Sequence, residues 1–109
     1  PGTPVVGTWI ARNIETPDGD AIADGGMAMV ATISDAGTIA FNITGDQLGY
    51  CDPGPDCTIT GTWTHTDNTV TIDSGTGNAT VNYSIDGDIM TWTGTIGGVA
   101  TEIVFNRLL

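Results

Sequence analysis

The amino-acid sequence predicts an all-β protein, folded as a small antiparallel up-and-down β-barrel of about eight strands. Its 109 residues include 19 threonines, 12 isoleucines and 7 valines but only 3 leucines, 2 glutamates and one glutamine, and β-branched side chains suit a pleated sheet, so no helix is expected. Glycine and aspartate gather between alternating runs, where tight turns need them. Trp9 and Arg107, near opposite ends of the chain, are placed to close the barrel. The length predicts one domain over residues 1–109.

The first half of the chain predicts three strands. Residues 5–14 alternate but carry apolar side chains on both faces, as in a strand that bends at Gly7 or is partly covered outside. A turn follows at residues 17–20, and residues 21–23 are a candidate short edge segment. Residues 27–33 and 39–43 alternate on either side of an Asp-Ala-Gly turn and predict a hairpin.

The second half predicts five more strands. Residues 58–66 alternate most clearly, with threonine at every even position facing water. Residues 69–73, 78–85, 88–96 and 99–107 follow, and the Asp86-Gly87 pair is a strong signal for a two-residue hairpin. Every connection is too short for a crossover, so neighbouring strands are antiparallel. Closure into a barrel would leave no unpaired edges.

The pairing of Trp9 with Arg107 is the most specific structural prediction. The chain has two arginines, Arg12 and Arg107, and no lysine, so we expect a structural role for Arg107 instead of a role in general solubility. We predict that Arg107 lies flat over the Trp9 indole where the first and last strands meet. Such a cation–π contact is worth about 0.5–2 kcal/mol.

Cys51 and Cys57 are the two cysteines of the chain and are predicted to form a disulfide. Closing so short a loop stabilises by about 2 kcal/mol and requires an oxidising compartment. A redox pair or a metal site is the alternative, but the CxxC spacing and further ligands are missing. We therefore expect a secreted, periplasmic or cell-surface protein.

The net charge of −11 bears on the partners of the protein. Nucleic acid and anionic membranes would repel so acidic a domain, and both are excluded as partners. No run approaches the roughly 18 apolar residues of a membrane span, so no membrane insertion is expected. The acidity fits either the solubility of an extracytoplasmic domain or adaptation to high salt.

Three short motifs carry a resemblance to a known family. Val6-Gly7-Thr8-Trp9, the hairpin over residues 83–88 and the closing Phe105-Asn106-Arg107-Leu108 resemble the calycin superfamily, and within it short bacterial lipocalin-like domains. The resemblance implies an up-and-down barrel in which Trp9 and Arg107 are structural and the interior is open to a ligand at one end. The chain is shorter than the larger lipocalins and shows no helix after the barrel, which argues against a large cavity.

No catalytic residue, metal or other cofactor is predicted. His65 is a lone histidine, predicted half-buried at a strand end, and no nucleophile–base pair is visible. Aspartates that could suggest calcium lack the required spacing. These are Asp18, Asp20, Asp46, Asp52, Asp56, Asp86 and Asp88.

The predicted function is binding of a small hydrophobic molecule at a barrel mouth framed by the loop from Thr44 to Cys57. The candidate ligand-binding residues are predicted to face inward: Met27, Met29, Phe41, Trp63, His65, Tyr83, Met90 and Trp92. A core filled by these side chains remains an alternative. Two further alternatives are an assembly module that self-associates through its threonine-rich faces and a cyclase or isomerase using Tyr83, His65 or Glu102.

Overall fold

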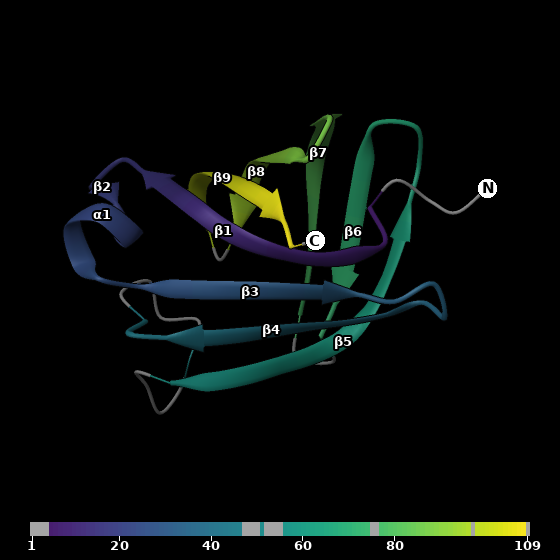
Figure 1. Cartoon of the computed structure of the whole chain (residues 1–109), viewed down its shortest axis with the longest axis horizontal. Coiled ribbons are helices and arrows are strands. Elements are labelled where there is room, and N and C mark those ends of the chain that lie inside the picture. The colour runs from purple at the N-terminus through teal and green to yellow at the C-terminus, as the bar shows by residue number, and fades with distance from the viewer. Residues whose placement is uncertain (1–4, 47–50, 52–55, 75–76, 97, 109) are drawn as a thin grey trace.

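The computed structural model describes residues 5–46, 51, 56–74, 77–96 and 98–108. These residues form β1 (Gly7–Thr16), β2 (Gly19–Asp20), α1 (Ala21–Gly25), β3 (Ala28–Ile33), β4 (Thr38–Thr44), β5 (Cys57–His65), β6 (Thr69–Asp73), β7 (Asn78–Asp86), β8 (Ile89–Ile96) and β9 (Val99–Arg107). Strands β3 to β9 pair in chain order, and β1 pairs with both β3 and β9 (Figure 1). The prediction of a closed antiparallel barrel of eight strands is confirmed, with β2 as an extra strand beside β1.

Strand β1 joins the two ends of the sheet. It pairs with β3 only from Gly7 to Ile10 but with β9 from Trp9 to Glu15, with a register shift between Ala11 and Asn13. Its first half therefore lies between β3 and β9, as Figure 1 shows, and its second half leaves β3. Such a shift bends a strand, which a small closed barrel requires.

Alternation places apolar side chains inside the barrel and polar ones outside. The threonines of β5 are exposed, whereas Trp63 on the other face is buried. The largest fully buried side chains come from β1, β3, β4, β8 and β9 and from Met27 just before β3: Trp9, Ile14, Met27, Ile33, Ile39, Ile43, Met90, Trp92, Ile103 and Phe105.

The expectation that the chain contains no helix is wrong at residues 21–25. Residues 19–20 form β2, and the next five form α1 in place of the expected edge segment. The Asp20 side chain caps the helix by accepting the N–H of Ile22 at 2.9 Å, and Gly26 ends it with a φ of 72°. These two caps, together with burial of Ala21, outweigh the low helix content expected from composition.

Strand β5 separates from β6 halfway along its length. It pairs with β4 from Cys57 onward but with β6 only from Thr62 to His65. Gly61 marks the point of separation, since a Cβ there would overlap the carbonyl oxygen of Asp73. The end of β6 therefore lies directly against Gly61, and the first half of β5 continues without β6 beside it.

Candidate ligand-binding cavity

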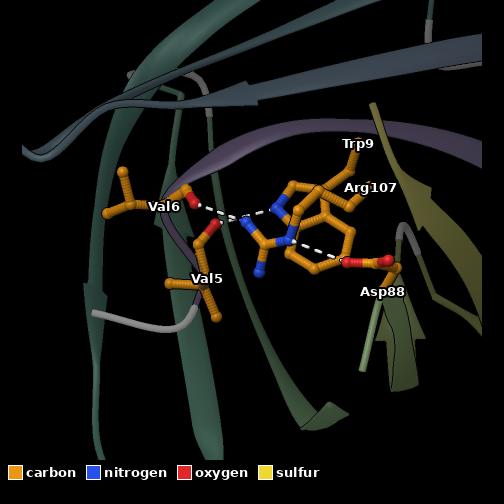
Figure 2. A network of polar contacts seen from close by, with 5 residues as sticks. All are labelled: Val5, Val6, Trp9, Asp88 and Arg107. Carbon is orange, nitrogen blue, oxygen red and sulfur yellow. Dashed lines mark hydrogen bonds and ion pairs between the residues drawn. The ribbon is translucent and has the colours of Figure 1, made fainter. Parts of the chain in front are cut away.

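Arg107 lies over Trp9 at the end of the barrel where β1 begins and β9 ends, which we call the closed end (Figure 2). Its guanidinium carbon lies 4.2 Å from the ring centroid of Trp9, and its Nη1 donates to the carbonyl of Val6 at 3.0 Å. The Trp9 indole N–H donates to the carbonyl of Val5 at 2.9 Å, and Asp88 approaches the Arg107 Nε at 3.7 Å. This is the geometry that the sequence predicts for the seam between the first and last strands.

Gly7 makes room for this arrangement. Its φ of 141° lies in a region that disfavours side chains, and a Cβ would lie 2.9 Å from the Arg107 Nη1. The Gly-Thr-Trp motif is thus explained locally: glycine admits the guanidinium, and tryptophan supplies the ring on which it stacks.

Three of the candidate binding residues lie toward this closed end. Trp63 is buried and donates its indole N–H to the carbonyl of Ser34 at 2.9 Å. Tyr83 is half-buried, and its hydroxyl donates to the carbonyl of Thr66 at 3.4 Å. His65 lies 5.5 Å from the Trp63 ring, between ring centroids.

The expectation that His65 is half-buried is wrong, because the structure exposes it. It is the last residue of β5, where the barrel wall ends and the inward direction leads to solvent instead of the core. Alternation along a strand therefore assigns a face correctly but does not tell how deep the position lies.

A cavity of about 570 Å³ occupies the opposite part of the barrel. It extends toward the end where β5 and β7 begin and β8 ends. Three of the candidate binding residues, Met29, Phe41 and Trp92, line it. The others do not: Met27, Trp63, His65, Tyr83 and Met90.

The remaining apolar lining consists of residues that the sequence did not single out. They are Ile43, Ile59, Ile72, Ala79, Val81, Ile96 and Ile103. The same inward alternation marks most of them, but aromatic and methionine side chains were preferred for their contact area. Thr58, Thr60, Ser74, Gly77 and Asn78 complete the lining. None of the described lining residues carries a charge, so the cavity favours uncharged, apolar occupants.

Trp92 forms part of the cavity wall and of the aromatic core. Its ring meets Phe105 edge-on at 4.9 Å and Phe41 at 6.1 Å, measured between centroids. Its indole N–H is buried and has no hydrogen-bond partner among the described residues. Edge-to-face packing on two neighbouring rings gives this wall a fixed shape.

The predicted disulfide is present beside the cavity. Cys51 is buried and joins Cys57, the first residue of β5, with 5.6 Å between their Cα atoms. Asp46 accepts the N–H of Cys51 at 2.7 Å, and Asp56 accepts the N–H of Gly45 at 3.0 Å. These aspartates therefore bind backbone amides of the loop. Most of that loop, including residues 47–50 and 52–55, lies outside the described residues.

Asp20 also binds groups of the neighbouring chain. Asp20 accepts from the N–H groups of Ile14 and Ile22 and from the Asn13 amide. Partial burial raises the pKa of Asp20, but these hydrogen bonds outweigh it and the pKa lies below its ordinary value. In the part of the chain that the structure describes, no three His, Cys, Asp or Glu side chains group as metal ligands would. Asp52 lies outside that part.

Of the residues considered for enzymatic chemistry, Tyr83 and His65 both contact the carbonyl oxygen of Thr66, at 3.4 and 3.2 Å, outside the cavity. Glu102 is exposed and pairs across the strands with Glu15. Neither Glu102 nor Tyr83 nor His65 lines the cavity.

Among the described helices, none is long and apolar enough to cross a membrane.

Comparison with known proteins identifies this architecture. The family model of the lipocalin-like domain matches residues 5–92. An uncharacterized protein from Bacteroides eggerthii aligns with a TM-score of 0.58 and 17% identity, over 94% of this chain and 98% of that one. The fluorescent protein UnaG aligns with a TM-score of 0.50 and 14% identity, over 95% and 97%. At these identities both structures show a shared fold only, and no curated protein gives a match. The chain belongs to the lipocalin-like domain family.

Proposed function

We propose that this domain binds a small hydrophobic molecule inside the barrel, at the end beside the Cys51–Cys57 disulfide. The observation that carries the proposal is the uncharged, mostly apolar cavity of about 570 Å³. Small-molecule sites fall at about 300–1,000 Å³ and are mostly apolar. Binding is driven by removal of apolar surface from water, about 25 cal/mol per Å².

We infer that a ligand enters the barrel from one end only, because the two ends differ in character. The side chains of Arg107, Trp9 and Trp63 fill the closed end, and each donates a hydrogen bond to a backbone carbonyl. Thr58, Ser74 and Asn78 surround the other end of the cavity. A ligand therefore enters beside the start of β5 and stops against Phe41 and Trp92.

We further infer an extracytoplasmic location, in the periplasm, at the cell surface or in the medium. The Cys51–Cys57 disulfide supports it, since such bonds persist in oxidising compartments. The acidity of the chain is compatible with such a location.

Titration with the dye 1-anilinonaphthalene-8-sulfonate or its uncharged analogue N-phenyl-1-naphthylamine, read through tryptophan emission, tests the proposal. We expect saturable one-to-one binding of the uncharged dye. The emission change should disappear in Trp92→Phe, because Trp92 lines the cavity, and persist in Trp63→Phe, because Trp63 does not. An emission change that survives in Trp92→Phe and is lost in Trp63→Phe would place the dye elsewhere.

A pair of alanine substitutions separates cavity binding from surface binding. Ala79 lines the cavity, whereas Ala100 is exposed on the outside. Ala79→Phe should weaken binding of the uncharged dye at least about tenfold, by filling space that the dye needs. Ala100→Phe should leave it unchanged. Equal affinity in both variants would contradict binding in the cavity.

Self-association through the outer face of β5 is a second candidate function. The observation that favours it is a row of four exposed threonines, Thr58, Thr60, Thr62 and Thr64. Light scattering over a range of protein and salt concentrations tests it. A monomer under all conditions would exclude it.

A further inference from the structure

The cavity wall contains an interrupted stretch of sheet beside the first half of β5. On one side, β5 pairs with β4 from Cys57 to Thr62. On the other side, its pairing with β6 begins only at Thr62. Among the described residues, no strand pairs with β5 on this second side between Cys57 and Gly61.

The direction of the backbone groups along this stretch follows from one hydrogen bond. The N–H of Trp63 donates to the carbonyl of Gly37 at 3.1 Å, on the β4 side. Backbone groups of an antiparallel strand point alternately to its two neighbours. Ile59 and Gly61 therefore face β4 as Trp63 does, and Thr58 and Thr60 face the side where β6 is missing.

The composition of the cavity lining agrees with this assignment. The side chains of Thr58 and Thr60 are on the exposed, outer face of the sheet, yet both residues line the cavity. Their backbone edge accounts for this. Each residue offers one N–H and one C=O toward the cavity.

The described residues across the gap form hydrogen bonds with one another. Ser74, Gly77 and Asn78 line the cavity opposite β5. The N–H and the hydroxyl of Ser74 both donate to the carbonyl of Gly77, at 3.0 and 3.2 Å. These two groups of Ser74 therefore bond to Gly77, and among the described residues no pairing with β6 is found for the first half of β5.

We propose that the cavity accepts a short apolar peptide in extended conformation, which adds to the edge of β5 as a strand. Its backbone would pair with Thr58 and Thr60, and alternate side chains would enter the cavity against Phe41, Ile59 and Ile72. Added strands gain affinity from backbone pairing and specificity from such alternate pockets. This inference rests on the proposed function, since it assigns a ligand class to the same cavity.

The charges around the gap refine the ligand. Asp56 directly precedes β5, and Asp73 ends β6 opposite Thr62. Both carboxylates are exposed at the borders of an uncharged cavity. A peptide with an apolar centre and positively charged flanks matches this distribution.

The test uses an acetylated and amidated five-residue peptide with three central valines and a lysine at each end. We expect saturable binding by calorimetry. A second peptide carries N-methyl groups on the amides that pair with β5, which removes their donors and blocks the approach. It should bind at least about tenfold more weakly. Equal binding of the two peptides would overturn the inference.

Amide hydrogen exchange observed by NMR provides a residue-level readout. Without peptide, the amides of Thr58 and Thr60 should exchange faster than those of Ile59 and Gly61, which the β4 pairing protects. Peptide binding should slow exchange at Thr58 and Thr60 at least tenfold. Protection of these two amides before any peptide is added would show that the edge is already paired.

Thr60→Pro removes one edge N–H but no hydrogen bond to β4, because the backbone groups of Thr60 face away from β4. Proline is tolerated where the N–H faces outward from a sheet. The substitution should abolish peptide binding. In the wild-type protein, dye binding with no binding of the unmethylated peptide overturns the inference alone. Failure of both ligands overturns the proposed function with it. If the variant does not fold, the methylated peptide still decides the question.

Discussion

At the scale of single residues, Arg107 has the most connected side chain at the closed end. It stacks on Trp9, donates to the carbonyl of Val6 and lies near Asp88. Its side chain is 25% exposed, whereas that of Asp88 is 61% exposed. The stacking and the hydrogen bond therefore outweigh the ion pair, which solvent weakens.

Replacing Arg107 should destabilise the protein through the loss of these contacts. We expect Arg107→Met to lower the free energy of unfolding by about 1–3 kcal/mol, from one cation–π contact and one charged hydrogen bond. Arg107→Lys should recover less than half, because an ammonium lacks the planar face that stacks. Urea unfolding followed by circular dichroism measures both.

Arg12→Lys is the matched control, since Arg12 is the other arginine and is exposed. It should change the free energy of unfolding by less than about 0.5 kcal/mol. Equal losses for Arg12→Lys and Arg107→Lys would mean that the arginine at the seam has no special role.

At the scale of elements, β5 and β6 separate at Gly61. The end of β6 lies directly against this glycine, which has no side chain to block it. A side chain there would overlap the Asp73 carbonyl, and backbone cannot yield as a flexible side chain can. We expect Gly61→Ala to cost about 2 kcal/mol or more in the free energy of unfolding. Chemical denaturation measures it.

Gly77→Ala is the control for Gly61→Ala. A Cβ at Gly77 would meet nothing within 4 Å, and its φ is not in the left-handed region. The substitution should be neutral to within about 0.5 kcal/mol. A neutral Gly61→Ala would show that β6 does not press on β5 as described.

The attachment of α1 to β1 should depend on pH through Asp20. The pKa of Asp20 in the folded protein lies below its ordinary value of 3.8. The stabilisation by the carboxylate is therefore complete at pH values well above 3.8. The contribution is lost as the pH falls through the folded pKa. Asp20→Asn should therefore be less stable than the wild type at pH 6, and the difference should shrink below about pH 4.

Asp18→Asn changes the net charge by the same amount two residues away and reports the effect of charge alone. Thermal unfolding of the three proteins between pH 3 and pH 6 makes the comparison. If the stability difference between Asp20→Asn and Asp18→Asn stays constant across this range, Asp20 does not act through its carboxylate.

At the scale of the whole molecule, the net charge of −11 opposes compaction. Salt screens this repulsion, with a Debye length of about 10 Å at 0.1 M and about 3 Å at 1 M. We expect the melting temperature to rise by several degrees between 10 mM and 0.5 M NaCl at pH 7. The rise should largely vanish near pH 4.1, where the net charge approaches zero. A melting temperature that does not respond to salt at pH 7 would contradict self-repulsion.

The sequence by itself determined the barrel, because alternation, turn residues and the Trp9–Arg107 pair are local or single-contact signals. It also indicated the disulfide, since Cys51 and Cys57 have no other cysteine to pair with. It missed α1, although Asp20 and Gly26 carry cap signals, because composition was weighted above capping.

Only the tertiary structure decided where the cavity lies. Inward alternation gives Trp63 and Trp92 the same direction, but one fills the closed end and the other lines the cavity. Likewise, nothing in the threonine repeat of β5 indicates that its pairing with β6 begins only at Thr62, next to Gly61. A strand pattern specifies faces, whereas depth along the barrel and gaps between strands depend on how all strands pack together.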